Sequence, residues 1–190
     1  MQCTAGMHPD LPHHPCQARR GFSLLELLVT LLVAAIVLAL AVPALGELVL
    51  NARRTANVNA LIASIQLARS ESAKRGLPVV VCHSADRLSC SGNNFDQGWL
   101  VFVNRNAESP PMIDAADTVL LAHVPEADAS IRSNRPFYIF RPYFRRSTNG
   151  TVTFCDRRGH TAARAVVISY TGRPRVATSR SRGRALVCAG

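Results

Sequence analysis

The most apolar stretch of the chain runs from Phe22 to Leu45 and contains only three polar residues, Ser23, Glu26 and Thr30. As an α-helix this stretch would be about 36 Å long, which exceeds the ~30 Å hydrocarbon core of a bilayer. The pattern therefore predicts a membrane-spanning helix over residues 22–45 rather than a helix buried in a protein core.

After this span the apolar pattern changes from continuous to periodic. Between Asn51 and Arg75, apolar residues recur at spacings of three and four and form one stripe, consisting of Val58, Leu61, Ile62, Ile65 and Ala68. Gly76 and Pro78 then stop the helix. We expect one helix of about 54 residues from Phe22 to Arg75. Its second part, an amphipathic stalk over residues 46–76, would pack against a domain.

From residue 77 onward, short β-type runs alternate with turn-rich stretches. The runs are Val79–Cys82, Trp99–Val103, Val119–Val124, Phe137–Phe140, Thr151–Cys155, Ala165–Tyr170, Arg175–Ala177 and Ala185–Cys188. One long helix followed by these strands predicts an α+β fold in which an antiparallel sheet packs on the helix. Residues 77–190 would form this β-rich globular domain and end in an Arg-rich tail.

Residues 1–18 show no regular apolar period, and Arg19, Arg20 and Gly21 follow them directly before the span. Three interpretations compete for this arrangement. A cleaved secretory signal would need an unusually long apolar region that also contains a carboxylate. A plain single-span anchor explains the length of the run but leaves the Glu26 carboxylate unpaired in lipid, which is energetically costly.

The third interpretation accounts for every polar group. Basic residues followed by Gly21, Phe22 and Glu26 closely resemble the leader of type IV pilins and pseudopilins, and Pro43 lies where many pilins have a proline. The resemblance implies that residues 1–21 are a leader that a prepilin peptidase removes after Gly21, with methylation of Phe22. It also implies that Glu26 pairs with the terminal amine of a neighbouring pilin. The chain would then be a single-pass inner-membrane protein with a periplasmic globular domain, and later part of a pilus at the cell surface.

The cysteines fall into two groups. Two lie in the leader together with three histidines, and we treat this cluster as accidental: Cys3, His8, His13, His14 and Cys16. The four in the mature chain are Cys82, Cys90, Cys155 and Cys188. An even number in a domain outside the inner membrane suggests two disulfides, and sequence proximity favours joining the first two and the last two. The pairing stays open at this point. A metal site of Cys82, His83 and Cys90 is the alternative, but it lacks the paired ligand spacing of zinc sites.

The net charge of +10 is distributed unevenly along the chain. Residues 130–190 contain 13 basic residues and one acidic residue, whereas residues 76–129 contain two basic and seven acidic residues. The sequence thus predicts one polarised cationic surface instead of a uniformly basic protein. Such a surface favours an anionic partner, such as nucleic acid, anionic lipid or an acidic protein.

Three stretches of the carboxyl half resemble the FimT/GspH family of minor pilins and pseudopilins: GWLVF at 98–102, GTVTFCD at 150–156 and AVVISYTGRPR at 165–175. Within the last stretch, Gly172-Arg173-Pro174-Arg175 matches the GRxR motif with which FimT-like proteins hold DNA in natural transformation. The resemblance therefore implies that Arg173 and Arg175 bind DNA. A pseudopilin of a type II secretion system, with protein partners only, is the alternative within this family.

The residues make DNA contact physically plausible on their own. Gly172 can adopt the positive φ of a tight turn, Pro174 stiffens the loop, and guanidinium groups match phosphate geometry. Further arginines follow at alternate positions: Arg180, Arg182 and Arg184. The tail contains no aromatic residue after Gly172, which argues against base stacking there and for non-specific contact with phosphates. Solvated loops, or docking of another minor pilin, are the competing explanations of the tail.

Eight more arginines have a facing that the sequence leaves undecided: Arg132, Arg135, Arg141, Arg145, Arg146, Arg157, Arg158 and Arg164. The histidines of the globular part, His83, His123 and His160, have no matching carboxylate or nucleophile, and no Gly-rich phosphate loop precedes a helix. We therefore predict no catalysis, no cofactor, no metal and no small-molecule substrate. The expected partners are DNA, other major and minor pilins, prepilin peptidase and the inner membrane.

Overall fold

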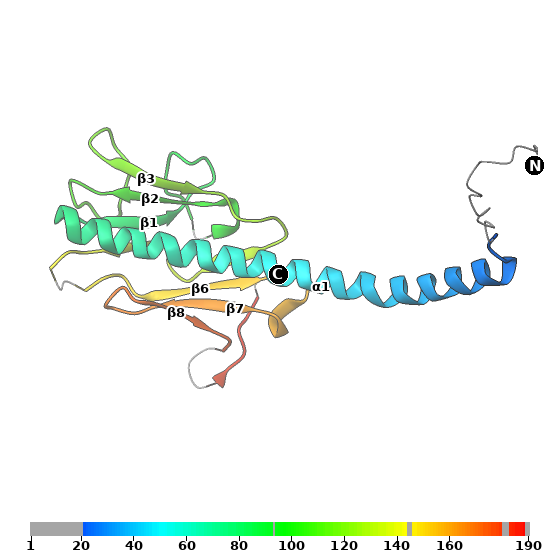
Figure 1. The fold of residues 1–190 in the computed structure, drawn as a ribbon. Coiled ribbons are helices and arrows are strands. Elements are labelled where there is room, and N and C mark those ends of the chain that lie inside the picture. Colours follow the sequence, from blue (N-terminus) through cyan, green and yellow to red (C-terminus); the bar gives the residue numbers. More distant parts are fainter. Residues whose placement is uncertain (1–20, 93, 144–145, 180–182, 189–190) are drawn as a thin grey trace, which may run out of the picture. The chain divides into compact units, whose positions relative to one another are not determined.

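The structure is a computed structural model that describes residues 21–92, 94–143, 146–179 and 183–188. The chain divides into two compact units, residues 1–44 and residues 45–190. Helix α1 (Leu24–Arg75) begins in the first unit and ends in the second (Figure 1). It starts at Leu24 rather than at Phe22, and it ends at Arg75 as predicted.

Within the second unit, α1 buries one face, and this face contains the predicted apolar stripe. Its buried residues are Leu50, Asn57, Val58, Leu61, Ser64, Ile65, Ala68 and Ser72. The buried polar residues among them make hydrogen bonds. Asn57 Oδ1 accepts one from the Glu126 amide at 2.8 Å, and the Ser64 hydroxyl lies 2.9 Å from the Ala60 carbonyl. The stripe can therefore contain polar side chains without leaving them unsatisfied.

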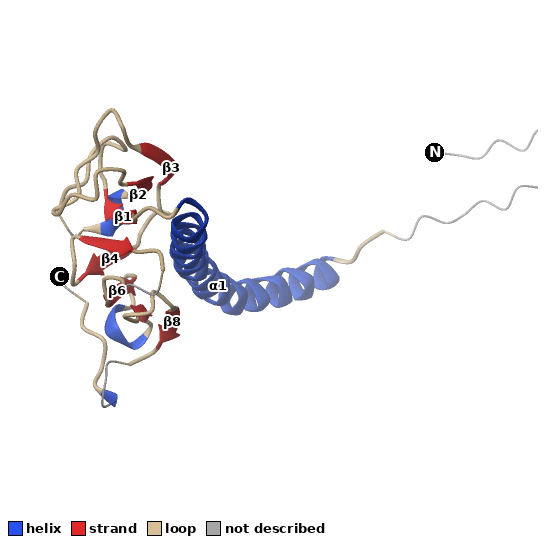
Figure 2. Cartoon of the chain, turned by 90° about the vertical axis from the view of Figure 1, so that its left-hand side faces the viewer, coloured by secondary structure: helices blue, strands red, loops and turns tan. Residues whose placement is uncertain are grey.

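The strands that the structure describes form two four-stranded antiparallel sheets. The first has the order β3 (Thr118–His123), β2 (Trp99–Val103), β1 (Val79–His83) and β5 (Phe137–Phe140). The second has the order β4 (Ser130–Ser133), β6 (Gly150–Cys155), β7 (Arg164–Ile168) and β8 (Pro174–Ala177). Short 3-10 helices, η1 (Phe95–Gln97) and η2 (Gly159–Thr161), lie in the connections. Figure 2 shows both sheets on the same side of the neighbouring part of α1. This arrangement confirms the predicted α+β class.

The two central strands of the first sheet, β1 and β2, are buried along their whole length. Alternate residues, such as Val79 and Val81, join the core formed with α1, and the residues between them, such as Val80, join a second apolar cluster on the opposite face. Because both faces of these strands are covered, their sequences read as continuous apolar runs.

Two details of the predicted strands were wrong. The run Ala185–Cys188 forms no strand; instead Leu186 packs, 2% exposed, against Ala163 and Ala165 beside Cys155. The structure also has a strand that the pattern did not indicate, β4, in which Ile131 is the one apolar residue. It forms because it pairs along β6, in a register that places Ile131 opposite Phe154.

Two disulfides join the four cysteines of the globular part, Cys82 with Cys90 and Cys155 with Cys188. This is the pairing that proximity in the sequence favours. Because the Cys82 and Cys90 sulfurs are bonded to each other, they provide no thiolate for a metal beside His83. The second disulfide joins the segment after β8 to the end of β6.

Candidate functional site

The first unit presents apolar side chains to its surroundings. Phe22 is 74% exposed and the apolar residues that follow are exposed as well, so this part of α1 is long and apolar enough to cross a membrane. The Ser23 hydroxyl accepts a hydrogen bond from the Glu26 amide at 3.2 Å, which caps the first turn of the helix. Glu26 is the acidic residue of that turn. The motif residues thus stand at the very start of the helix, on an otherwise apolar surface.

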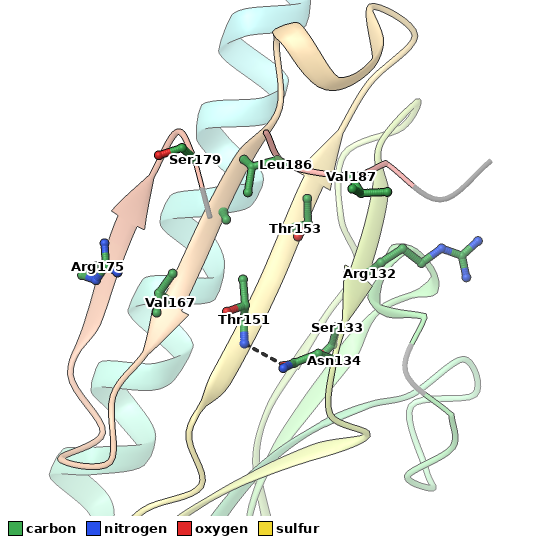
Figure 3. Close-up of a pocket in the computed structure, with 11 residues that line it drawn as sticks. Arg132, Ser133, Asn134, Thr151, Thr153, Val167, Arg175, Ser179, Leu186 and Val187 are labelled. Atoms are coloured by element: carbon green, nitrogen blue, oxygen red, sulfur yellow. Dashed lines mark hydrogen bonds between the residues drawn. The ribbon is translucent and has the colours of Figure 1, made fainter. Parts of the chain in front are cut away.

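A groove of about 610 Å³ lies on the face of the second sheet that points away from α1 (Figure 3). Residues that pair directly across neighbouring antiparallel strands share a face of the sheet. Arg132 pairs with Thr153, and Thr151 pairs with Val167, which in turn pairs with Arg175. The two arginines therefore stand on opposite edge strands, β4 and β8, with threonines and valine between them (Figure 3).

The groove is basic and polar. Its described lining residues include two arginines, two threonines, two serines and an asparagine, and they include neither aspartate nor glutamate. Asn134 closes one wall by accepting a hydrogen bond from the Thr151 amide at 2.8 Å. Leu186 and Val187 contribute from the segment that the Cys155–Cys188 disulfide holds in place. A groove of this chemistry suits an anionic ligand better than a cationic one.

The turn between β7 and β8 presents Arg173. The Gly172 amide donates a hydrogen bond to the Ser169 carbonyl at 2.8 Å, and the Ser169 amide donates one to the Arg173 carbonyl at 3.1 Å. Gly172 has φ +73°, and a Cβ at this position would lie 3.0 Å from the Phe140 ring. Glycine is required here for both its conformation and its lack of a side chain. The turn is thus tightly built, and both Arg173 and Arg175 are exposed.

The predicted arginines of the tail are only partly visible. Arg184 is exposed, whereas Arg180 and Arg182 lie outside the described residues. Within the described part of the chain, the side chains of Arg132, Arg173 and Arg175 form neither hydrogen bonds nor ion pairs. Arg132 had no assignable facing from the sequence, because the four-residue strand that carries it contains too few apolar residues to show an alternation.

Some arginines stabilise the fold instead. Arg158 binds the Asp156 carboxylate at 2.6 Å and the Glu47 carboxylate at 2.7 Å, and Arg54 lies 3.9 Å from Asp156 and donates to the Ala162 carbonyl. Hydrogen bonds from Arg158 hold the pKa of Asp156 below its usual value and raise the pKa of Arg158. Burial, followed by the neighbouring arginine charges, lowers the pKa of Arg54. This network joins α1 to the end of β6, so it removes Arg158 from the exposed cationic surface.

We expect Asp156→Asn to lower the free energy of unfolding at pH 7 by about 2 kcal/mol, because two buried arginines lose their charged acceptor. A depressed carboxyl pKa stabilises the fold above the unfolded pKa of about 3.9, and this stabilisation is lost as the pH falls through the lower, folded value. The difference between wild type and variant should therefore shrink below pH 4, as measured by urea unfolding of residues 45–190. Asp128→Asn, which breaks the exposed pair with Arg53, is the control and should cost less than about 1 kcal/mol. Equal losses for the two variants would contradict a stabilising role of this network.

The histidines do not assemble a reactive site in the described residues. Burial lowers the pKa of both His83 and His123. His123 stacks beside Trp99, with ring centroids 4.2 Å apart, and His83 lies 6.2 Å from the Phe95 ring. In the described ranges, no group of three or more His, Cys, Asp or Glu side chains is placed to hold a metal ion. Packing accounts for the positions of these two rings.

Comparisons with known proteins agree with this architecture. A search with the sequence finds no match among curated proteins. Two crystal forms of the type IV minor pilin FimU of Pseudomonas aeruginosa resemble the structure, with 16% and 17% identity and a TM-score of 0.48 each. Both cover 65% of this chain, and the matches span 91% and 87% of the FimU chains.

The family models are more specific. Residues 16–42 match the prokaryotic N-terminal methylation motif, around Gly21, Phe22 and Glu26. Residues 57–172, more than half of the chain, match the model described as type II transport protein GspH. The matched segment includes the buried stripe of α1 and the strands from β1 to β7. The chain therefore belongs to the GspH family and is a type IV minor pilin or pseudopilin.

Proposed function

We propose that this chain is a minor type IV pilin that binds DNA without sequence preference during natural transformation. In this proposal prepilin peptidase removes residues 1–21, Phe22 becomes the methylated N-terminus, and residues 22–45 anchor the chain in the inner membrane. The stalk of residues 46–76 and the globular residues 77–190 lie in the periplasm before assembly. The Glu26 carboxylate then pairs with the N-terminal amine of a neighbouring pilin as the subunit enters the pilus, which reaches the cell surface.

The observation that carries the DNA-binding part is the groove between Arg132 and Arg175. Its described lining lacks carboxylates, and Arg173 stands on the adjoining turn. Guanidinium groups donate to phosphate oxygens in a planar, bidentate geometry, so such a surface suits the sugar-phosphate backbone of DNA. Phosphate contacts position a protein on DNA but do not read its sequence. The proposed binding is accordingly non-specific, and Arg180, Arg182 and Arg184 of the tail are proposed to add to it.

The salt dependence of binding tests this proposal. If five arginines contact phosphates on a duplex, the logarithm of the binding constant should fall with the logarithm of salt at a slope of about −4 to −5. The double variant Arg173→Ala, Arg175→Ala should weaken binding and reduce the slope by about 2. Electrophoretic mobility shift and fluorescence anisotropy on a mixed-sequence duplex measure both quantities.

A matched control is available in the acidic middle segment. The variant Arg87→Ala, Arg105→Ala removes the same charge from two other exposed positions. It should leave the slope unchanged, since these side chains lie outside the groove. An affinity independent of salt, or equal effects of the two double variants, would contradict phosphate contact through Arg173 and Arg175.

One observation favours a second candidate function. The model that covers residues 57–172 is described as a type II transport protein, which supports a minor pseudopilin that initiates a secretion pseudopilus and binds protein partners only. The two candidates share the processed N-terminus and the membrane anchor, and they differ in the anionic partner. If the wild-type chain fails to shift DNA at low salt, the secretion function is the one to pursue.

A further inference from the structure

A second pocket, of about 560 Å³, lies where the end of α1 meets the loop after β5 and the turn after β7. Its described lining contains two tyrosines and three arginines: Tyr143, Tyr170, Arg69, Arg141 and Arg146. The volume is within the range of ~300–1,000 Å³ typical of ligand pockets. These residues come from three separate parts of the sequence, so only the fold brings them together.

The floor of the pocket is rigid. Phe140, at the end of β5, is 1% exposed and forms part of the core. The buried Ser72 hydroxyl lies 3.0 Å from the Phe140 carbonyl and 2.8 Å from the Leu77 carbonyl, which ties the last turn of α1 to β5. The Ser147 amide donates a hydrogen bond to the Tyr170 carbonyl at 2.9 Å. The two loops that carry the tyrosines are thus joined to each other and to the core.

The two tyrosine rings are nevertheless exposed. Tyr143 is 77% exposed and Tyr170 is 57% exposed. A Cβ on Gly76, the residue after α1, would lie 2.7 Å from the Tyr143 hydroxyl, so Tyr143 crosses the end of the helix at a point where only glycine leaves room. Tyr143 itself has φ +55°, a conformation that non-glycine residues seldom adopt. Backbone strain of this kind clusters at functional sites, where the surrounding structure holds it in place.

The charge around the rings has one sign. The Arg146 guanidinium lies 5.7 Å from the centroid of the Tyr170 ring, within the distance of a cation–π contact. Arg141 donates a hydrogen bond to the Arg146 carbonyl at 3.1 Å, which holds the two arginines in the same loop region. The described residues of this pocket include no carboxylate, whereas Glu108 lines the neighbouring hollow on the other side of Tyr143. A negatively charged group is therefore favoured on the Tyr170 side.

Exposed aromatic faces next to guanidinium groups match the chemistry of single-stranded DNA. An unstacked base stacks on a tyrosine ring or a guanidinium plane, and the adjoining phosphate binds arginine. Bases in a duplex are already stacked and cannot enter such a pocket. Thr171 lines the pocket and lies two positions before Arg173, so the pocket adjoins the turn proposed above to bind phosphates.

From this geometry we propose that the pocket between Tyr143 and Tyr170 is a base-stacking site for single-stranded DNA, with Arg69, Arg141 and Arg146 as phosphate ligands. The site rests on the DNA binding proposed above, and it adds a preference for strands whose bases are accessible. The absence of aromatic residues from the tail argued against stacking within the tail. The tyrosines outside it provide the stacking surface.

The test compares three fluorescent probes of equal length by anisotropy at low salt, with the full-length chain purified in detergent. The probes are a mixed-sequence single strand, a strand of abasic sites with the same phosphates, and a duplex. Wild type should bind the base-bearing strand at least about 5-fold more tightly than the abasic strand. The variant Tyr143→Ala, Tyr170→Ala should remove this difference and leave the affinities for the abasic strand and the duplex unchanged. Tyr143→Phe, Tyr170→Phe, which keeps both rings, should retain it.

The failure of the pocket and the failure of DNA binding can be told apart. Equal affinity of wild type for the base-bearing and abasic strands overturns the stacking site while phosphate binding stands. An equal loss on all three probes in the tyrosine-to-alanine variant, as expected for Arg173→Ala, Arg175→Ala, also overturns it. If wild type binds none of the probes, the DNA-binding function itself fails and the pocket fails with it. Photocrosslinking of a bromodeoxyuridine strand supports the site if Tyr143 or Tyr170 is in the modified peptide, and opposes it if neither is.

Discussion

Replacing Trp99 with alanine is expected to lower the free energy of unfolding of residues 45–190 by about 3–5 kcal/mol. Trp99 is 1% exposed and lies in the core that α1 shares with both sheets. Its ring centroid is 6.4 Å from that of Phe95 and 4.2 Å from that of His123, so truncation leaves a cavity bounded by rigid rings. Neighbouring strands hold these rings in place, which limits how far the site can collapse.

The indole group also makes a specific polar contact. Its Nε1–H donates a hydrogen bond to the Ser64 hydroxyl at 2.9 Å, on the buried face of α1. Trp99→Phe keeps most of the ring and removes this donor, so it should cost less than the alanine variant. Ser64→Ala isolates the hydrogen bond and should cost about 1 kcal/mol. Urea unfolding of the three variants measures the series, and a loss below about 1.5 kcal/mol for Trp99→Ala would contradict a central role of this ring in the core.

Removing the Cys155–Cys188 disulfide is expected to have a similarly large effect, because it closes the longer of the two loops. The two cysteines are 33 residues apart in the sequence. In the chain-entropy account, cross-linking at this separation stabilises the folded state by about 3–4 kcal/mol. The segment that it holds, residues 183–188, belongs to no strand of either sheet. Its attachment therefore depends on the disulfide and on the buried Leu186 side chain.

The variant Cys155→Ala, Cys188→Ala should thus unfold at a clearly lower urea concentration than the oxidised wild type. Cys82→Ala, Cys90→Ala is the matched control, since these cysteines are only eight residues apart and cross-linking them should contribute about 2–3 kcal/mol. Titration of free thiols in the oxidised protein should find none among these four cysteines. A larger loss in the control than in the Cys155–Cys188 variant would show that loop closure is not the main contribution.

The second disulfide also matters for the proposed function. Leu186 and Val187 line the groove between Arg132 and Arg175, and the Cys155–Cys188 bond holds the segment that carries them. Opening the bond would release one wall of the groove without removing an arginine. The structure thus separates arginines by role, since Arg54 and Arg158 bind Asp156 while Arg132, Arg173 and Arg175 are available to an anionic partner.

Several features could be predicted from local pattern alone. The end of α1 at Arg75, its buried stripe and strands such as Trp99–Val103 follow from apolar periodicity and from Gly76 and Pro78. The N-terminal motif, which the methylation-motif model also matches, is contiguous in sequence and needs no tertiary contact to be recognised. The two disulfides likewise join cysteines that are neighbours in chain order.

Other features depend on contacts between distant residues, and local pattern failed there. The run Ala185–Cys188 has strand-like composition, but a disulfide and the burial of Leu186 hold it instead of strand pairing. The strand Ser130–Ser133 has little composition of its own and forms because β6 provides its hydrogen-bonding partner. In both cases the deciding interaction is with a segment far away in the sequence.

By itself, then, the sequence determined that this chain has a prepilin-type N-terminus, an apolar span, an amphipathic stalk and a β-rich domain with a basic end, because each depends on residues close together in the chain. Only the tertiary structure decided which arginines bind Asp156, which stand beside the groove, and that Tyr143 and Tyr170 share one pocket. The facing of a side chain depends on strand register and on what packs against the strand. Both are set by long-range pairing, which composition and spacing do not encode.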